Sequence, residues 1–436
     1  MFNPKIFICL LLPCIFTVSV FAGSEDAKTA GSDITLKRAL SLTEQHNPEL
    51  AAYSTGIKAT RAEQLQSSLK PNPELEVEME NVGGTGGHSG LDTLETAVML
   101  SQLVEVGGKL EKRRDVSRLG VKIADLDYQH KRISVFSEVQ KAYFKVLQAQ
   151  QQEQLTSEIL ELSRESLRIV TLRVESGRDS PVEISQARVT LSRAESSHEQ
   201  ARRDLKYAKR QLSGFWGSDE PQFDRALGDF QSLDVPANET ALKAALESTP
   251  RIKSNDVLVS QKRAELELER ARAKGDITIG GGVKWMNESD DASLLFGISI
   301  PLPVNSRNQG TIQAASYRLA MAKRGSMAAR QELLNQFNAA YLELSSAFEN
   351  AEALRDNILP ESEKIYNTVL QSYREGKTDF LRVIEAQQAL FDVKSEYVSC
   401  LLRYHLANAE LDRLCTLNPR ANQTVNKFSG NINDEK

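Results

Sequence analysis

The stretch RVESGRDSPVEISQAR (173–188) interrupts a pattern that otherwise predicts one continuous helix. The run from Lys109 to Ser176 contains no proline and a single glycine, and as a helix it would be a rod of about 100 Å. Gly177 ends this pattern, and Pro181 is a favoured first residue of a new helix. We therefore predict a long helical hairpin with a tight turn at its tip.

A second stretch, SYREGKTDFLRVIEAQ (372–387), repeats this arrangement around Gly376, 199 residues further on. Apolar residues follow both turns at alternating spacings of three and four, as left-handed coiled coils require. The first row is Ile184, Ala187, Leu191, Ala194, His198, Ala201, Leu205, Ala208 and Leu212. The second row is Val383, Ala386, Leu390, Val393, Tyr397, Cys400, Tyr404, Ala407 and Leu411. We predict two coiled-coil hairpins, with tip turns at 177–181 and 376–379.

The helices before the turns match as well. Phe136, Val139, Tyr143 and Val146 align with Leu334, Phe337, Tyr341 and Leu344 at nearly the same offset. The chain therefore reads as two repeats, at 33–213 and 239–417. The segment between them, 214–238, is expected to form a belt around the helices, but no pattern predicts its fold.

Within each repeat the period changes from helical to strand-like. Leu75, Val77 and Met79 alternate with Glu76, Glu78 and Glu80, and a second alternating run beginning near Glu95 follows a glycine-rich loop. The second repeat shows the same pattern, so we predict one β-hairpin at 75–103 and another at 276–303.

These alternating runs have the length of tilted membrane-spanning strands, about ten residues. Four strands cannot close a membrane barrel, because the smallest known barrels have about eight. A membrane-spanning chain of this kind must therefore oligomerise. The alternative is an ordinary soluble four-stranded sheet.

The N-terminus has the features of an exported protein. Residues 1–22 combine a basic residue, an apolar run and a small final residue, which predicts a secretory signal peptide. Cys14 follows Leu-Leu-Pro rather than a small residue, so lipidation is not expected. The net charge of -5 and the lack of a basic patch interleaved with aromatics argue against a nucleic-acid partner. The polar tail, 418–436, is expected to be disordered.

Several motifs together resemble the TolC-like outer-membrane efflux proteins. They are Leu36-x-x-Ala39-Leu40, Asn47-Pro48-Glu49-Leu50, the duplicated helix-hairpin-helix unit and the two glycine turns. PNPELEVEMEN (71–81) and ETAVMLSQLVEVGGK (95–109) are similar to the heavy-metal subgroup, the outer-membrane partners of cobalt-zinc-cadmium or copper-silver exporters.

This resemblance implies a mostly α fold with a small β part. Long coiled-coil hairpins would form a periplasmic tunnel, and each chain would add four strands to the twelve-stranded outer-membrane barrel of a homotrimer. The implied partners are outer-membrane lipid, a periplasmic adaptor of the membrane fusion type and an inner-membrane, proton-driven pump of the resistance-nodulation-division type.

The predicted function is a passive conduit that exports heavy-metal cations. A multidrug efflux or type I secretion channel remains the alternative. A soluble periplasmic coiled-coil adaptor would explain the helical hairpins but neither the two β-hairpins nor the full duplication. The chain contains no GxSxG, P-loop or HExxH motif and its five histidines are scattered, so neither an enzyme, a cofactor nor a bound metal is expected.

Glu76, Glu78, Glu80 and Glu95 fall on the polar faces of the first β-hairpin. In a barrel they would line the lumen, where a threefold ring of negative charge favours cations. The alternative is that any water-filled barrel needs a polar inner face.

The resemblance also implies an aperture near the tips, lined by acidic residues six and nine positions past the second glycine. Here these positions hold Arg382 and Glu385, and Glu183 lies six positions past the first glycine. One hypothesis is that Glu183 and Arg382 pair to hold the aperture shut. The alternative is that Glu183 only caps its helix, in a capping box with Ser180, while Arg382 is solvated.

The tip turns are the predicted docking surface for the adaptor. Either Thr378 or Asp379 is expected to cap the helix after the second turn. The docking residues are Gly177, Arg178, Asp179, Gly376, Lys377, Thr378 and Asp379.

Overall fold

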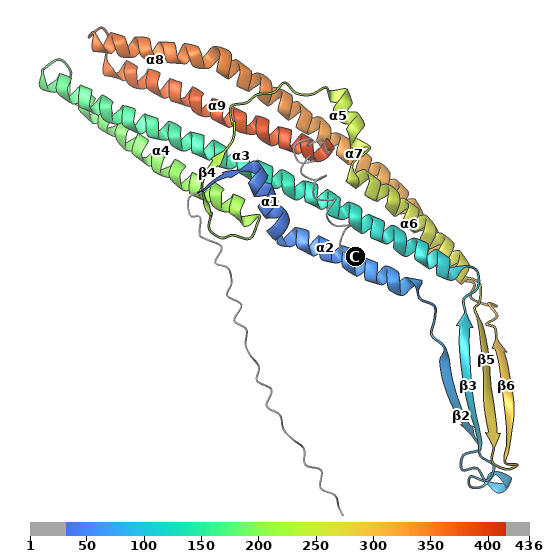
Figure 1. Cartoon of the computed structure of the whole chain (residues 1–436). Coiled ribbons are helices and arrows are strands. Elements are labelled where there is room, and N and C mark those ends of the chain that lie inside the picture. Colours follow the sequence, from blue (N-terminus) through green and yellow to red (C-terminus); the bar gives the residue numbers. More distant parts are fainter. Residues whose placement is uncertain (1–31, 416–436) are drawn as a thin grey trace, which may run out of the picture.

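The computed structural model describes residues 32–415, so the predicted signal peptide and polar tail lie outside the described residues. Long antiparallel helices form a rod, and a sheet of four strands projects from one end of it (Figure 1). Both tip turns lie at the opposite end of the rod. None of the helices in residues 32–415 is long and apolar enough to cross a membrane.

Nine α-helices build the rod from the described residues. The first repeat contributes α1 (Leu36–His46), α2 (Pro48–Ser68), α3 (Lys109–Glu175) and α4 (Pro181–Gly214). The second contributes α5 (Glu239–Leu246), α6 (Pro250–Arg272), α7 (Gln309–Ala353), α8 (Leu359–Arg374) and α9 (Phe380–Cys415). Helices α2, α4 and α6 each have a proline in the first turn. The first N–H groups of a helix have no hydrogen-bond partner within the helix, so a proline there, which lacks an N–H, removes no hydrogen bond.

The coiled-coil seams predicted after the turns are confirmed by burial. Ala187, Ala194 and Ala201 recur every seven residues along α4, and all three are buried. On α9, Val383, Leu390 and Cys400 are buried in the same way, among others of the predicted row. The helices therefore hold the core of the rod, and the predicted mostly α fold class is confirmed.

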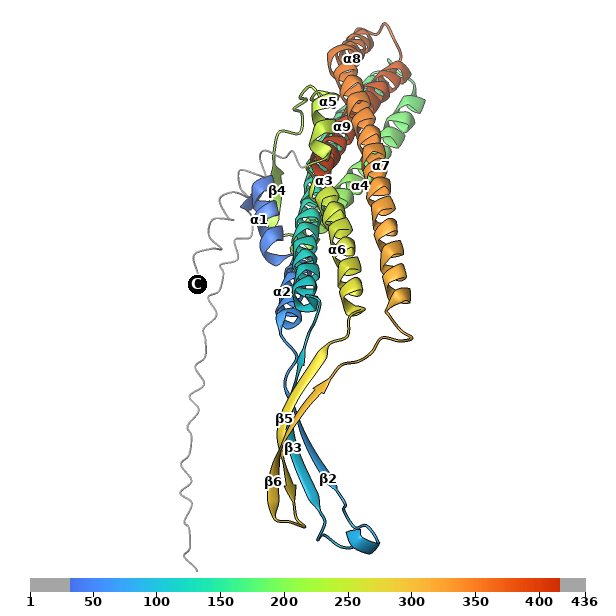
Figure 2. The ribbon, with the colours of Figure 1, turned by 90° about the vertical axis from the view of Figure 1, so that its right-hand side faces the viewer.

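The sheet has the order β2 (Glu74–Glu80), β3 (Glu95–Val104), β5 (Ile277–Met286) and β6 (Asp291–Ser299), with every pair antiparallel. The two hairpins join through β3 and β5, each of which is ten residues long. Figure 2 shows that the sheet extends away from the helices, so that its hairpin loops are the most distant part. The outer edges, β2 and β6, pair with no other strand within the described chain.

The sheet has two different faces, because directly opposed residues share a face. One face is apolar and solvent-exposed. Its large side chains are Leu75, Val77, Met79, Val98, Leu100, Ile279, Val283, Trp285, Leu294, Phe296 and Ile298. The other face carries the glutamates of β2. The sheet buries neither face within one chain.

The belt segment contains a strand that the sequence pattern did not predict. β4 (Phe223–Leu227) pairs in parallel with β1 (Ser32–Thr35) and lies against α3. The Tyr143 hydroxyl on α3 lies 2.8 Å from the carbonyl oxygen of Ile34 and 2.6 Å from that of Leu227. Contacts with α3 therefore hold the belt in place.

The second repeat carries one extra residue inside a helix. Between α7 and α8 the chain forms a π-helical turn, Leu354–Ile358. Before this turn the repeats align at an offset of 198, as for Val139 and Phe337, and after it at 199, as for Gly177 and Gly376. A π-turn absorbs a single inserted residue without rotating the helices on either side. The insertion thus leaves both seams in register.

Deletion of Asn357, an exposed residue of the π-turn, is expected to be tolerated, because it returns α8 to the register of the first repeat. The matched control is deletion of Glu158, the equivalent exposed residue of α3, which has no π-turn to absorb the change. There the following residues rotate by about 100°, which moves the buried Val170 out of its seam. Thermal unfolding of the purified proteins measures the difference, and an equal loss in both deletions would refute this explanation.

Candidate functional site

The two tip turns share one backbone conformation. Gly177 and Gly376 have φ angles of 73° and 74°, in the left-handed region that favours glycine. The N–H of Arg178 bonds to the carbonyl of Arg173 at 2.9 Å, and that of Lys377 to the carbonyl of Ser372 at 2.8 Å. Both helices thus end in a Schellman-type turn.

A cluster of three side chains joins the two tips. The guanidinium of Arg173 donates to both carboxylate oxygens of Asp179, at 2.6 and 2.9 Å. The hydroxyl of Tyr373, from the other hairpin, donates to Asp179 at 2.8 Å. Arg173 also donates to the backbone carbonyl of Tyr373 at 3.2 Å and lies 4.4 Å from the centre of its ring. We call these three residues the tip cluster.

The tip cluster changes the predicted role of Asp179. Its side chain is only 7% exposed, so it points into the protein rather than toward a docking partner. Of the other predicted docking residues, Thr378 is half-buried, while the rest are exposed: Gly177, Arg178, Gly376, Lys377 and Asp379. Sequence reasoning missed Tyr373, because it lies on the other hairpin, 194 residues from Asp179. It also missed Arg173, which lies only six residues before Asp179 on the same hairpin.

Glu183 lies beside the tip cluster in an unfavourable position for a charge. Its Oε2 atom is buried and has no hydrogen-bond partner among the described residues. Burial, and next the negative charge of Asp179, raise the pKa of Glu183. Asp179 behaves oppositely, since the hydrogen bond from Arg173 lowers its pKa.

The predicted capping box does not form. The hydroxyl of Ser180 accepts from the N–H of Val182 at 3.4 Å, whereas the N–H of Glu183 bonds to the backbone carbonyl of Ser180. The Glu183 side chain faces Asp179 instead of reaching back to the start of its helix. After the second turn, Asp379 is the cap: its Oδ1 accepts from the N–H of Arg382 at 3.1 Å.

Glu183 and Arg382 do not pair within one copy of the chain. The guanidinium of Arg382 lies 3.2 Å from Glu385, one turn along the same helix, and both side chains are exposed. Glu183 faces inward instead, as described above. Arg382 and Glu385 therefore form a solvated pair on the surface of the tip.

The four predicted lumen glutamates share the polar face of the sheet. Glu80 lies directly opposite Glu95, and Glu78 and Glu76 follow on the same face of β2. Lys284 on β5, which sequence reasoning missed, lies 2.7 Å from Glu80 and also pairs with Glu95. Glu76 and Glu78 have no ion-pair partner within residues 32–415.

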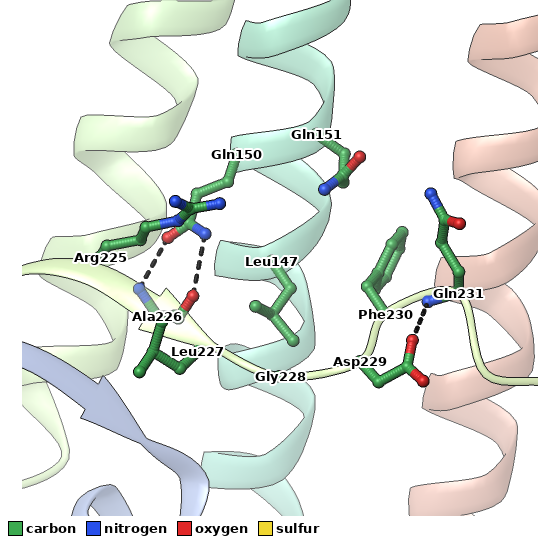
Figure 3. Close-up of a pocket in the computed structure, with 10 residues that line it drawn as sticks. All are labelled: Leu147, Gln150, Gln151, Arg225, Ala226, Leu227, Gly228, Asp229, Phe230 and Gln231. Carbon is green, nitrogen blue, oxygen red and sulfur yellow. Dashed lines mark hydrogen bonds between the residues drawn. The ribbon is translucent and has the colours of Figure 1, made fainter.

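A small cavity of about 240 Å³ lies between α3 and the belt (Figure 3). Gln150 occupies its wall and exchanges two hydrogen bonds with the backbone of Ala226, at 2.8 and 3.0 Å. Asp229 accepts from the N–H of Gln231 at 3.1 Å. The Gln150 bonds hold the belt against α3, so the cavity belongs to the scaffold. Across the described chain, no group of three or more potential metal ligands is present.

A sequence model described as "Outer membrane efflux protein" matches residues 39–218 and 241–416. The chain is 27% identical over 387 residues to the cobalt-zinc-cadmium resistance protein CzcC of Cupriavidus metallidurans, covering 89% of this chain and 91% of the relative. It is 23% identical to the nickel-cobalt-cadmium resistance protein NccC of Alcaligenes xylosoxydans xylosoxydans, covering 71% and 70%. The crystal structure of the CmeC outer membrane channel of Campylobacter jejuni has the same fold, with a TM-score of 0.74, 14% identity and coverage of 90% and 88%.

Asp179→Asn is expected to loosen the tip, because it weakens the bidentate pair with Arg173 and the hydrogen bond from Tyr373. Hydrogen bonds to charged groups contribute about 1.5–3 kcal/mol, so amides at 174–182 should exchange at least tenfold faster. Hydrogen-exchange mass spectrometry on Asp179→Asn, Tyr373→Phe and the double variant measures the coupling between the two residues. Glu385→Gln is the control, and it should leave exchange unchanged. Strictly additive effects would contradict the cluster.

Glu183→Gln is expected to stabilise the tip at neutral pH. A carboxyl whose pKa is raised in the folded state destabilises that state once it ionises. This penalty is full above the raised pKa and absent below the ordinary value of 4.5. The variant should therefore show higher amide protection than wild type at pH 7, and the two should converge as the pH falls below that value. Equal protection at every pH would refute the assignment.

Proposed function

The chain belongs to the outer membrane efflux protein family, and we propose that it is the outer-membrane channel of a tripartite system that exports heavy-metal cations. The observation that carries this proposal is the two-faced sheet. A sheet with one exposed apolar face, one glutamate-bearing face and two unpaired edges suits the wall of a water-filled membrane pore.

The unpaired edges favour a closed assembly of several copies. In a bilayer every backbone N–H and C=O needs a partner, so β6 of one copy must pair with β2 of the next. Four strands are too few to close a barrel, since about eight are needed. Three copies, as the family resemblance implies, would give a twelve-stranded barrel whose apolar face contacts lipid.

The helices would continue this barrel as a tunnel. Next to the sheet, α2 packs on α3, α3 on α6 and α6 on α7, which leaves α2 and α7 as free edges. Both edges expose large side chains, such as Tyr53 and Leu65 on α2 and Tyr317 and Met321 on α7. In a ring, α7 of one copy would cover α2 of the next and bury these residues.

Heavy-metal cations are the proposed cargo on two grounds. The relatives described above are named as cobalt-zinc-cadmium and nickel-cobalt-cadmium resistance proteins. The polar face of the sheet carries Glu76, Glu78, Glu80 and Glu95, which would give the pore a negative lining that favours cations.

The tips are the proposed contact with a periplasmic adaptor, through which a proton-driven inner-membrane pump would deliver its substrate. The exposed tip residues Gly177, Arg178, Gly376 and Lys377 would meet the adaptor. Glu183, Arg382 and Glu385 from the three copies would line the aperture, and a pair between Glu183 and Arg382 could form only between copies. The tip cluster would fasten the two hairpins of each copy, so opening the aperture must strain or break it.

In a strain that retains the cognate pump and adaptor but lacks this chain, the protein is expected to restore growth on cobalt, zinc or cadmium. Resistance to hydrophobic drugs should not change. Detergent-extracted outer membranes should contain a heat-resistant trimer. Rescue of drug resistance alone would favour the multidrug alternative, and recovery of only a soluble periplasmic protein would favour the adaptor alternative.

A further inference from the structure

Lys284 is the only cationic residue in strands β2, β3, β5 and β6. It lies on the polar face, near the hairpin loops farthest from the helices. We propose that Lys284 determines the ion selectivity of the channel, by offsetting one of the two charges of the outer glutamates Glu80 and Glu95 and so weakening cation binding there relative to the unpaired inner glutamates. This inference rests on the proposed function, because it requires the polar face to line a pore.

The local geometry places the ammonium group between the two outer glutamates. Lys284 is directly opposite Ala97 on β3, whose small side chain lets the lysine cross that strand. The Nζ atom thereby reaches Glu80 on β2, two strands away, at 2.7 Å. It also pairs with Glu95, which lies diagonally on β3.

The position of the lysine follows from a conflict on the sheet. Glu80 and Glu95 are direct cross-strand neighbours, and like charges in this arrangement destabilise a sheet. Lys284 bridges them and removes the repulsion. If Lys284 had only a structural role, it would do no more than relieve this repulsion. The test therefore needs a measurement that responds to charge in the pore rather than to stability.

No comparable group screens the inner glutamates. On the same face, β5 continues from Lys284 with Gly282 and Gly280. A Cβ atom at Gly282 would overlap the carbonyl oxygen of Val98, so that position cannot carry a side chain without movement of the backbone. Glu76 and Glu78 therefore face the pore without a neighbouring cation from the described strands.

This arrangement creates a gradient of charge along the pore. Conduction requires binding sites strong enough to attract an ion and an exit weak enough to release it. Each copy would offer unpaired carboxylates on the side of the helices, whereas on the side of the loops Lys284 would offset one of the two charges of Glu80 and Glu95. Lys284 would therefore weaken the hold on exported cations at the outer end.

The test uses the purified full-length trimer in planar bilayers with a KCl gradient. Lys284→Gln should raise the cation-to-anion permeability ratio by about twofold or more, and Cd²⁺ should reduce its conductance at a lower concentration than in wild type. Lys284→Arg should restore both values, since it keeps the charge. Lys243→Gln, on α5 of the second repeat, removes the same charge away from the sheet and should change neither.

A second pair of variants covers the case in which Lys284→Gln fails to assemble. Glu80→Gln/Glu95→Gln leaves the lysine unpaired, and adding Lys284→Gln to it gives a neutral group; neither variant contains the opposed carboxylates. The double variant should be less cation-selective than the triple variant. Equal ratios in conducting channels would overturn the proposal for Lys284, whereas a wild-type protein that forms no channel would overturn the proposed function itself.

Discussion

A sheet that buries neither of its faces cannot be stable alone, and this constraint governs the rest of the chain. The four strands have two unpaired edges and an exposed apolar face, so their backbone and side chains need partners outside one copy. The helical rod supplies the stability that the sheet lacks. Its buried seams, around residues such as Val139 and Phe337, hold α3 and α7 at the spacing from which the strands project. The sheet is therefore positioned by the rod, and in the proposed assembly neighbouring copies would pair with its free edges.

Residues that are equivalent in the two repeats form the buried helix seams, whereas the tip cluster is formed by residues that differ between the repeats. Val139 and Phe337 are repeat equivalents, and both are fully buried. The tip cluster has no such symmetry: at the offset of the turns, Asp179 corresponds to Thr378 and Tyr373 to Val174. Because the equivalents differ, one hairpin can supply the carboxylate and the other the hydroxyl that binds it.

The parts that follow a local period could be predicted from the sequence. Helix seams, the strands and their two faces depend on spacings of three to four or two residues, and the resemblance to outer-membrane efflux proteins is confirmed by the family match. That match also confirms a transport protein rather than an enzyme. The belt strand, the tip cluster and Lys284 could not be predicted, because each depends on partners on distant elements. The capping box does not form although Ser180 and Glu183 have the required spacing, because the Glu183 side chain faces Asp179 instead of the start of its helix.

The two ends of the molecule use similar groups under different solvation. At the tip, Arg173 binds Asp179 beside Glu183, and the paired side chains are 17% and 7% exposed. At the sheet, Lys284 lies between Glu80 and Glu95, with 23% of the lysine side chain and 49% of that of Glu80 exposed. Water screens the second group more strongly, so its ion pairs contribute little to stability. In the proposed pore, the same exposure would bring these charges close to the passing ions. Burial therefore suits the tip group to holding hairpins together, whereas exposure would suit the sheet group to acting on ions in the proposed pore.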